Sequence, residues 1–209
     1  MKRIIIFLFA FCTISLAADA QQYILSEFTL CVAKMKHGLP IREKFNYNCK
    51  TQRMEFMDGE NVMELSNPEQ VDTLFLPGHK MIPYAGRFLD ITYRCPSFTL
   101  AVDYKAKREN QGKVGAMGIK TQGSVESIDM RIIGQNPGVE HIKNIEVWKE
   151  HSDNGYYLVQ KSRMKRFVNA KTLLKIIPEK KVQLDAYLGQ HKTDFNDPDQ
   201  VLELLKEIL

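Results

Sequence analysis

The stretch from Arg42 to Leu76 decides the fold, and it reads REKFNYNCKTQRMEFMDGENVMELSNPEQVDTLFL. Apolar and polar residues alternate in short runs along it, which is the period of a β-strand, because successive side chains point to opposite faces. Asp58-Gly59 separates two of these runs and readily supplies the positive φ of a tight turn. We therefore expect a hairpin of Gln52–Met57 and Asn61–Leu65, followed by a strand at Val71–Leu76.

This stretch also predicts one buried face and further strands on either side of it. The apolar side chains that would share the face are Met54, Phe56, Met63, Leu65, Leu74 and Leu76. Similar alternation predicts the other strands, which are Tyr23–Lys36, Ile41–Cys49, Phe88–Arg94, Phe98–Lys105, and a hairpin of Ile145–Glu150 with Tyr156–Ser162. The sequence thus favours an antiparallel meander of short strands.

Residues 1–20 have the pattern of an export signal. Lys2-Arg3 precedes an apolar run, Ile4 to Leu16, and Ala18-Asp19-Ala20 fits a cleavage motif of small residues. We expect export through the inner membrane, cleavage near Ala20, and a soluble chain in the periplasm or outside the cell. A lipid anchor at Cys12 is the competing interpretation, but Phe11 stands where lipidation favours a small residue. No second long apolar run follows, so we expect no transmembrane segment in the mature chain.

The net charge and the cysteines bear on which partners, disulfides and metal or redox sites the protein could have. The 209 residues carry a formal net charge of +4, a surplus too small to indicate nucleic acid as a partner. Export makes a disulfide chemically feasible, and Cys31 with Cys49 is the candidate pair, since Cys31 would lie opposite about residue 46 of the next strand. The alternative is that Cys31, Cys49 and Cys95 are all free or buried thiols. No C-x-x-C pair is present to indicate a zinc or redox site.

The second half of the chain has a glycine-rich region and a helical end. Residues 106–139, which begin within the charged run Lys105–Asn110, contain six of the twelve glycines, and we expect a long surface loop there. From residue 169 onward the pattern is helical, with Asn169 and Asp197 as N-caps and Pro178 as a break. An apolar stripe at three- and four-residue spacing should dock the last helix onto the sheet, and it consists of Val201, Leu204, Leu205 and Ile208.

Catalytic and metal-binding motifs are missing from the sequence. The five histidines show no ligand spacing, and no G-x-S-x-G or phosphate-binding glycine motif occurs, so we expect no catalytic, cofactor or metal site. A basic cluster lies on or just after a strand, and it is made of Lys161, Arg163, Lys165 and Arg166. Such a cluster is either a solvated face or a site for an anionic partner, such as a membrane surface or an acidic glycan.

Three separated pieces, read together, resemble a family of exported Gram-negative envelope proteins of unknown function. They are LPIREKFNYNCKTQRMEFMDGENVMEL, VDTLFLPGHKMIPY and VNAKTLLKIIPEKKVQLDAYLGQHKTDFNDPDQVLELL. The resemblance implies a signal peptide, a β-rich body with an N-Y-N strand, and a compact helical tail. It implies no catalytic residue.

The sequence therefore predicts an α+β fold: an antiparallel meander of about 8–10 strands that could curl into a partial barrel, with two or three short C-terminal helices. Residues 1–20 would be the signal, 21–168 a β-rich domain, and 169–209 a helical segment packed on the sheet. We expect an exported, non-catalytic binding or interaction protein of the envelope. One alternative is a periplasmic carrier of a small molecule or lipid, lined by Met54, Met57 and Met63. The other is a hydrolase with a site assembled in space from Cys95 or His79.

Overall fold

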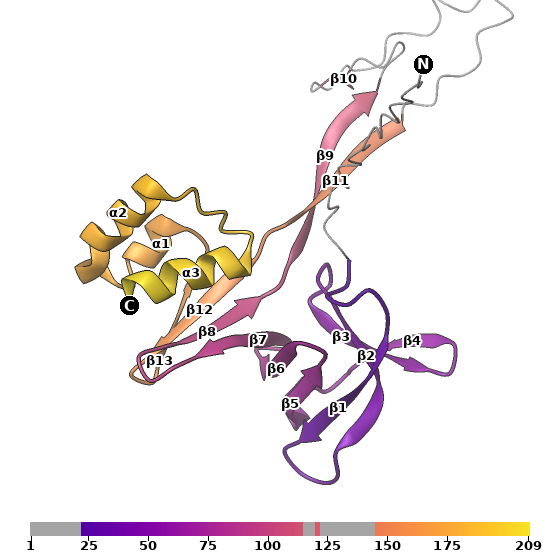
Figure 1. The fold of residues 1–209 in the computed structure, drawn as a ribbon. Helices are drawn as coiled ribbons and strands as arrows, with labels where there is room; N and C mark the ends of the chain where they lie inside the picture. The colour runs from indigo at the N-terminus through magenta and orange to yellow at the C-terminus, as the bar shows by residue number, and fades with distance from the viewer. Residues whose placement is uncertain (1–21, 115–119, 122–144) are drawn as a thin grey trace, which may run out of the picture.

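A computed structural model describes residues 22–114, 120–121 and 145–209, and it describes side chains outside residues 109–150. The expected signal peptide lies outside the described residues. The body is a ten-stranded antiparallel sheet, twisted along its length, with three short helices at one end (Figure 1). This confirms the α+β fold and the meander.

The sheet runs in the order β13-β12-β8-β7-β6-β5-β1-β2-β3-β4 and stays open, with β13 and β4 as its free edges. It is therefore a curved open sheet and not a closed barrel. Its strands are β1 Thr29–Met35, β2 Ile41–Asn48, β3 Arg53–Asp58, β4 Asn61–Glu64, β5 Val71–Leu76, β6 His79–Tyr84, β7 Arg87–Arg94, β8 Thr99–Asp103, β12 Gly155–Gln160 and β13 Arg163–Phe167.

Tight turns join most neighbouring strands. Gly59 (φ +63°) and Gly78 (φ +77°) take the left-handed conformation that the β3–β4 and β5–β6 turns require. The β12–β13 turn has two L-residues in this region instead, Lys161 (φ +46°) and Ser162 (φ +62°). Such a conformation costs an L-residue about 1 kcal/mol, so this turn is less favourable than the glycine-containing ones.

A second, three-stranded sheet forms a ribbon that projects from the body (Figure 1). It consists of β9 Ala106–Val114, β10 Lys120–Thr121 and β11 Ile145–Ser152, in the order β10-β9-β11. The expected hairpin of Ile145–Glu150 with Tyr156–Ser162 is wrong, because β11 pairs with β9 while β12 pairs with β8 and β13. The glycine-rich region also begins as a strand and not as a loop.

Asn154 explains why the expected turn does not form. Its Oδ1 accepts a hydrogen bond from the backbone N–H of Lys105 at 3.1 Å, and its Nδ2 donates to the carbonyl oxygen of Asn196 at 3.0 Å. Gly155 shows no positive φ and begins β12 directly. The chain therefore runs on from the ribbon into the body sheet, and Asn154 ties this junction to the loop before the last helix.

The three helices cover one face of the sheet at the β13–β12–β8 end (Figure 1). They are α1 Ala170–Leu174, α2 Lys181–Gln190 and α3 Pro198–Ile208, with a 3₁₀ turn at Pro178–Lys180 before α2. Asn169 caps α1 by accepting from the N–H of Thr172, and Asp197 caps α3 by accepting from that of Asp199, as the sequence predicts. All four residues of the predicted stripe on α3 are buried.

Two cores meet along the sheet on the helix side. One packs the helices against Leu100, Val102, Tyr156, Leu158 and Phe167. The other lies inside the curve of β1–β3 and β5–β7, and it contains Phe45, Tyr47, Met54, Leu74 and Met81. Met63 is the exception among the residues expected on the buried face: on the edge strand β4 it is 47% exposed, because no further strand covers it.

Candidate functional site

The four basic residues of the predicted cluster lie at the free edge formed by β13, but not on one face. Lys161 is in the β12–β13 turn. Lys165 is opposite Leu158, whose side chain lies in the core under the helices, so Lys165 projects on the helix side. Arg166 is opposite Tyr157 and projects on the other face, where its Nε lies 4.0 Å from a carboxylate oxygen of Asp103. Because side chains alternate between the two faces of a strand, Lys165 and Arg166 project on opposite faces although they are neighbours in the sequence.

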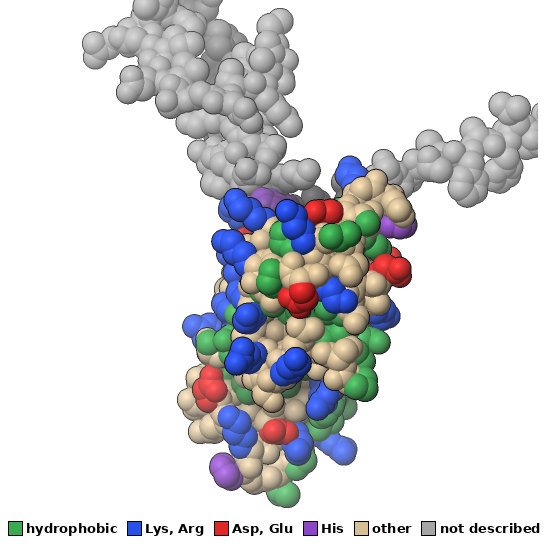
Figure 2. All heavy atoms as spheres, turned by 90° about the vertical axis from the view of Figure 1, so that its left-hand side faces the viewer, with side chains coloured by type: hydrophobic (Ala, Val, Ile, Leu, Met, Phe, Trp, Pro, Cys, Tyr) green, Lys and Arg blue, Asp and Glu red, His purple; other side chains and the backbone are tan. Residues whose placement is uncertain are grey.

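The structure adds four lysines from neighbouring elements. Lys171 lies on α1, which packs next to β13, Lys175 directly follows α1, Lys180 lies in the 3₁₀ turn, and Lys181 begins α2. We define the basic surface as Lys161, Arg163, Lys165, Lys171, Lys175, Lys180 and Lys181. Within residues 161–181 the only carboxylate is Glu179. None of the seven cations makes an ion pair with a described carboxylate. Figure 2 looks onto this side of the molecule, where Lys and Arg side chains greatly outnumber Asp and Glu.

Edge protection explains only part of this charge. Lys and Arg on a free edge strand prevent another chain from adding to the sheet, and Arg163 and Lys165 on β13 can serve that purpose. The lysines of α1 and of the following turn lie on helical elements, which have no such edge. Their accumulation around a single carboxylate, Glu179, is therefore a separate feature that needs its own explanation.

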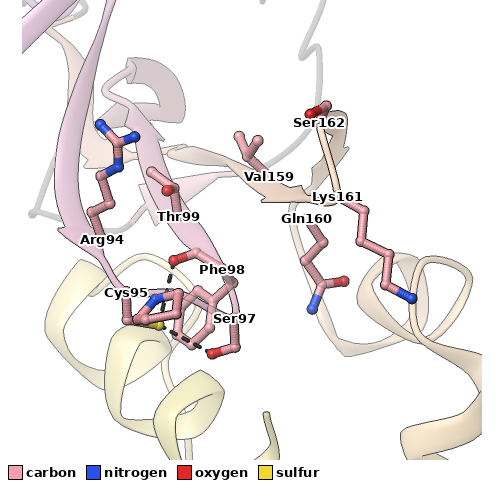
Figure 3. Close-up of a pocket in the computed structure, with 10 residues that line it drawn as sticks. Arg94, Cys95, Ser97, Phe98, Thr99, Val159, Gln160, Lys161 and Ser162 are labelled. Carbon is pink, nitrogen blue, oxygen red and sulfur yellow. Dashed lines mark hydrogen bonds between the residues drawn. The ribbon is translucent and has the colours of Figure 1, made fainter.

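A groove adjoins the basic surface and begins where β7 ends and β8 starts. Its first part is a hollow of about 530 Å³ between the β7–β8 turn and the β12–β13 turn (Figure 3). Its second part is a hollow of about 490 Å³ on the sheet face opposite the helices, which we call the open face. Arg94, Thr99 and Val159 line both hollows, so the two form one groove.

Four exposed cations line the groove: Lys36, Lys80, Arg94 and Lys161. Its one carboxylate, Asp72, lies 2.9 Å from the Nζ of Lys34. Hydrogen bonding to Lys34 and the charges of Lys34 and Lys36 hold the pKa of Asp72 below its ordinary value. The groove thus presents a net positive charge.

Cys95 lies in the first hollow, within hydrogen-bonding distance of Ser97 (Figure 3). Its Sγ is 3.1 Å from the Oγ of Ser97 and 3.4 Å from the carbonyl oxygen of Phe98. The Ser97 hydroxyl and neighbouring backbone groups lower the pKa of this thiol. Burial has the opposite effect on the other two thiols, raising the pKa of Cys31 and raising that of Cys49 to about 11.

The expected Cys31–Cys49 disulfide is not formed, and Cys31, Cys49 and Cys95 are free thiols. The register gives the reason: Cys31 lies opposite Glu43, and not opposite about residue 46 as expected. Cys49 is six residues further along the chain, which corresponds to about 20 Å of strand. A disulfide requires Cα atoms within about 7 Å.

The residues of the hydrolase hypothesis do not interact with each other. The Nδ1 of His79 lies 2.6 Å from Oδ2 of the buried Asp90, which also accepts from the hydroxyl of Tyr104 at 3.3 Å. The Sγ of Cys95 hydrogen-bonds with Ser97 and Phe98, which lie in its own turn. The geometry therefore joins His79 to a buried structural network and leaves Cys95 in the groove.

The methionines of the carrier hypothesis do not line a shared cavity. Met54 is buried in the core inside the curved sheet, and Met63 is exposed on β4. Met57 follows Phe56 on β3 and projects on the opposite face from Met54. Phe45, Tyr47 and Met54 fill the interior of the curve with their own side chains.

Among the described residues, no group of His, Cys, Asp and Glu side chains is arranged to hold a metal ion. None of the helices in the described part of the chain is both long and apolar enough to cross a membrane. No protein-family model, curated protein or solved structure matches the chain.

Proposed function

We propose that this protein is an exported, non-catalytic binding protein of the bacterial envelope, which holds a partner that presents several phosphate or carboxylate groups. The observation that carries the proposal is the basic surface: seven cations on β13, α1 and the adjoining turns, with no ion pair to a described carboxylate. The signal-peptide pattern of residues 1–20 supports export.

The physical basis of the proposed binding is the combined electrostatic attraction of several cations for one polyanionic partner. One exposed ion pair contributes little, because water and salt screen it. Several cations near an anionic surface contribute about 1 kcal/mol each, so a set of seven can hold a polyanionic partner. Since these charges lie on short, well-packed elements, they keep their spacing before the partner arrives. Binding should weaken steeply as salt is added.

Two probes with the expected chemistry test the proposal on the purified mature protein. One is vesicles of phosphatidylcholine containing phosphatidylglycerol, and the other is polyglutamate. We expect at least one of them to bind at low salt and to be released by added salt. A double substitution on α1, Lys171→Glu with Lys175→Glu, should abolish this binding.

The matched control makes the same charge change elsewhere. Arg42 and Lys44 are exposed on β2, toward the far edge of the sheet from β13. Arg42→Glu with Lys44→Glu should leave binding unchanged. If neither probe binds, or if both double variants lose binding equally, the basic surface is not a specific site and the proposal fails.

A further inference from the structure

The four cations of the groove form a row across the strands. Lys161 follows β12, Arg94 ends β7, Lys80 lies in β6 and Lys36 follows β1. In the sheet these elements come in the order β12-β8-β7-β6-β5-β1. With a spacing of about 4.8 Å between neighbouring strands, the row extends about 24 Å across the sheet, and it runs obliquely, because Lys36 lies at the opposite strand ends from Arg94 and Lys161. This is the dimension of an extended chain and exceeds that of a single small anion.

We propose that the groove is a second binding site, which takes an extended acidic oligosaccharide lying obliquely across the open face. Regularly spaced carboxylates of such a chain would meet the four cations in turn. Lys161 borders both the groove and the basic surface, but the other cations belong to one or the other. The two sites can therefore be tested separately.

The lining of the groove favours a sugar chain over other polyanions. Between the cations lie side chains that hydrogen-bond with hydroxyl groups: Thr73, Ser97, Thr99, Gln160 and Ser162. The floor is aliphatic, with Ile82, Ile91 and Val159 available to pack against C–H faces. A nucleic acid strand would need exposed aromatic rings for stacking, and the one aromatic residue that lines the groove, Phe98, is buried.

A peptide is a less suitable occupant of the groove, because the strands there have no unpaired main-chain groups to offer it. Extended peptides bind sheets by adding to a free edge, where main-chain groups are unpaired. The groove runs across β5–β8 and β12, and these strands are paired on both sides. A peptide lying there would find no backbone partners and would depend on its side chains alone.

The groove is also rigid enough to select a ligand. Leu89, Ala101 and Tyr157 are buried on the open face. Lys80 and Arg94 lie on strands that are paired on both sides, which favours a preformed arrangement of this part of the groove.

The test is a titration of the purified mature protein with a homogeneous oligogalacturonate of about six to eight units, followed by calorimetry. We expect binding that salt weakens, and a loss of affinity of about tenfold or more in the double variant Lys80→Gln with Arg94→Gln. Both residues are exposed, so this variant should fold normally. A neutral oligosaccharide of equal length should not bind.

Three outcomes would overturn the inference: no binding of the oligogalacturonate, unchanged affinity in the Lys80→Gln/Arg94→Gln variant, or equally tight groove binding by polyglutamate of matched charge. The variant Lys171→Gln with Lys175→Gln distinguishes the two sites and should leave oligogalacturonate binding unchanged. If it alone lowers affinity, the ligand binds at the basic surface, and the groove is not the site although the proposed function holds.

Discussion

The Oδ2 atom of Asp103 lies 3.2 Å from Nη2 of Arg87, joining the end of β8 to the start of β7. Asp103 also accepts a hydrogen bond from Nε2 of Gln52 at 2.8 Å, and Arg87 donates to the hydroxyl of Tyr157 at 3.1 Å. The Asp103 side chain is only 3% exposed. Burial raises its pKa above the ordinary value, although Arg87 and Arg166 favour the charged form. These contacts therefore link β7, β8 and β12 of the body sheet to Gln52, which lies in the turn between β2 and β3.

We expect Asp103→Ala to destabilise the protein by about 3 kcal/mol, because removing one partner of a buried pair leaves the other charge uncompensated. Nε of Arg87 is already buried without a partner among the described residues, which leaves little means of compensation. Urea unfolding measures the change. Arg163→Ala, on exposed β13, is the control and should stay within about 0.5 kcal/mol of wild type. Equal effects of the two substitutions would show that the Asp103 pair is not structural.

The docking of α3 gives a second prediction. Leu204 is fully buried between α3 and the sheet, whereas Val182 on α2 is 78% exposed. We expect Leu204→Ala to lower the free energy of unfolding by about 3 kcal/mol, through lost burial and the cavity left behind. Val182→Ala should change it by less than about 0.5 kcal/mol. A mild Leu204→Ala phenotype would mean that the helices contribute little to the stability of the sheet.

The backbone conformations of two turns predict that one substitution stabilises the protein and that another destabilises it. Ser162→Gly should stabilise the protein by about 1 kcal/mol, since glycine adopts positive φ without a steric penalty. Gly59→Ala should destabilise it by a similar amount, and no neighbouring atom lies near enough to add a clash. Thermal unfolding of both variants checks the pair. A destabilising Ser162→Gly would show that the serine side chain contributes contacts which outweigh its backbone cost.

The three thiols should differ in reactivity. Thiolate is the reactive form, and the lowered pKa of Cys95 gives it more thiolate at pH 7.5 than Cys49, whose pKa is about 11. Cys31 and Cys49 are also buried. With iodoacetamide we expect Cys95 to be labelled first, as followed by peptide mass spectrometry. Labelling of Cys49 at the same rate in the folded protein would contradict the structure around it.

Local patterns predicted most of the fold. The strand Val71–Leu76, the β3–β4 turn and the caps at Asn169 and Asp197 depend on residues close in sequence, and each forms as expected. Strand β6 was missed, because Pro83 lies within it and the alternating run is short. The pairing of β11 was predicted wrongly, because Asn154-Gly155 resembles a turn whose side chain in fact bonds across the junction.

Of the two candidate sites, one could be found from the sequence and the other could not. The basic cluster at residues 161–166 could be found from the sequence because its members are contiguous, although the separation of Arg166 onto the open face depends on the strand register. The groove could not be found, since Lys36, Lys80, Arg94 and Lys161 come from elements that only the sheet order brings into a row. Likewise, the Cys31–Cys49 pairing depended on a register that was about three residues from the true one.

The most direct test of the central claim is photo-crosslinking of the protein in intact cells, from a single position beside the basic surface. A photoreactive residue in place of Val182, next to Lys181, is exposed and should capture an anionic partner. The same residue in place of Val62, which is 49% exposed on the far edge strand β4, is the matched control and should not. We predict a reproducible product from position 182 that disappears with Lys171→Glu/Lys175→Glu. A product that survives this charge reversal, or that forms equally from position 62, would contradict the account.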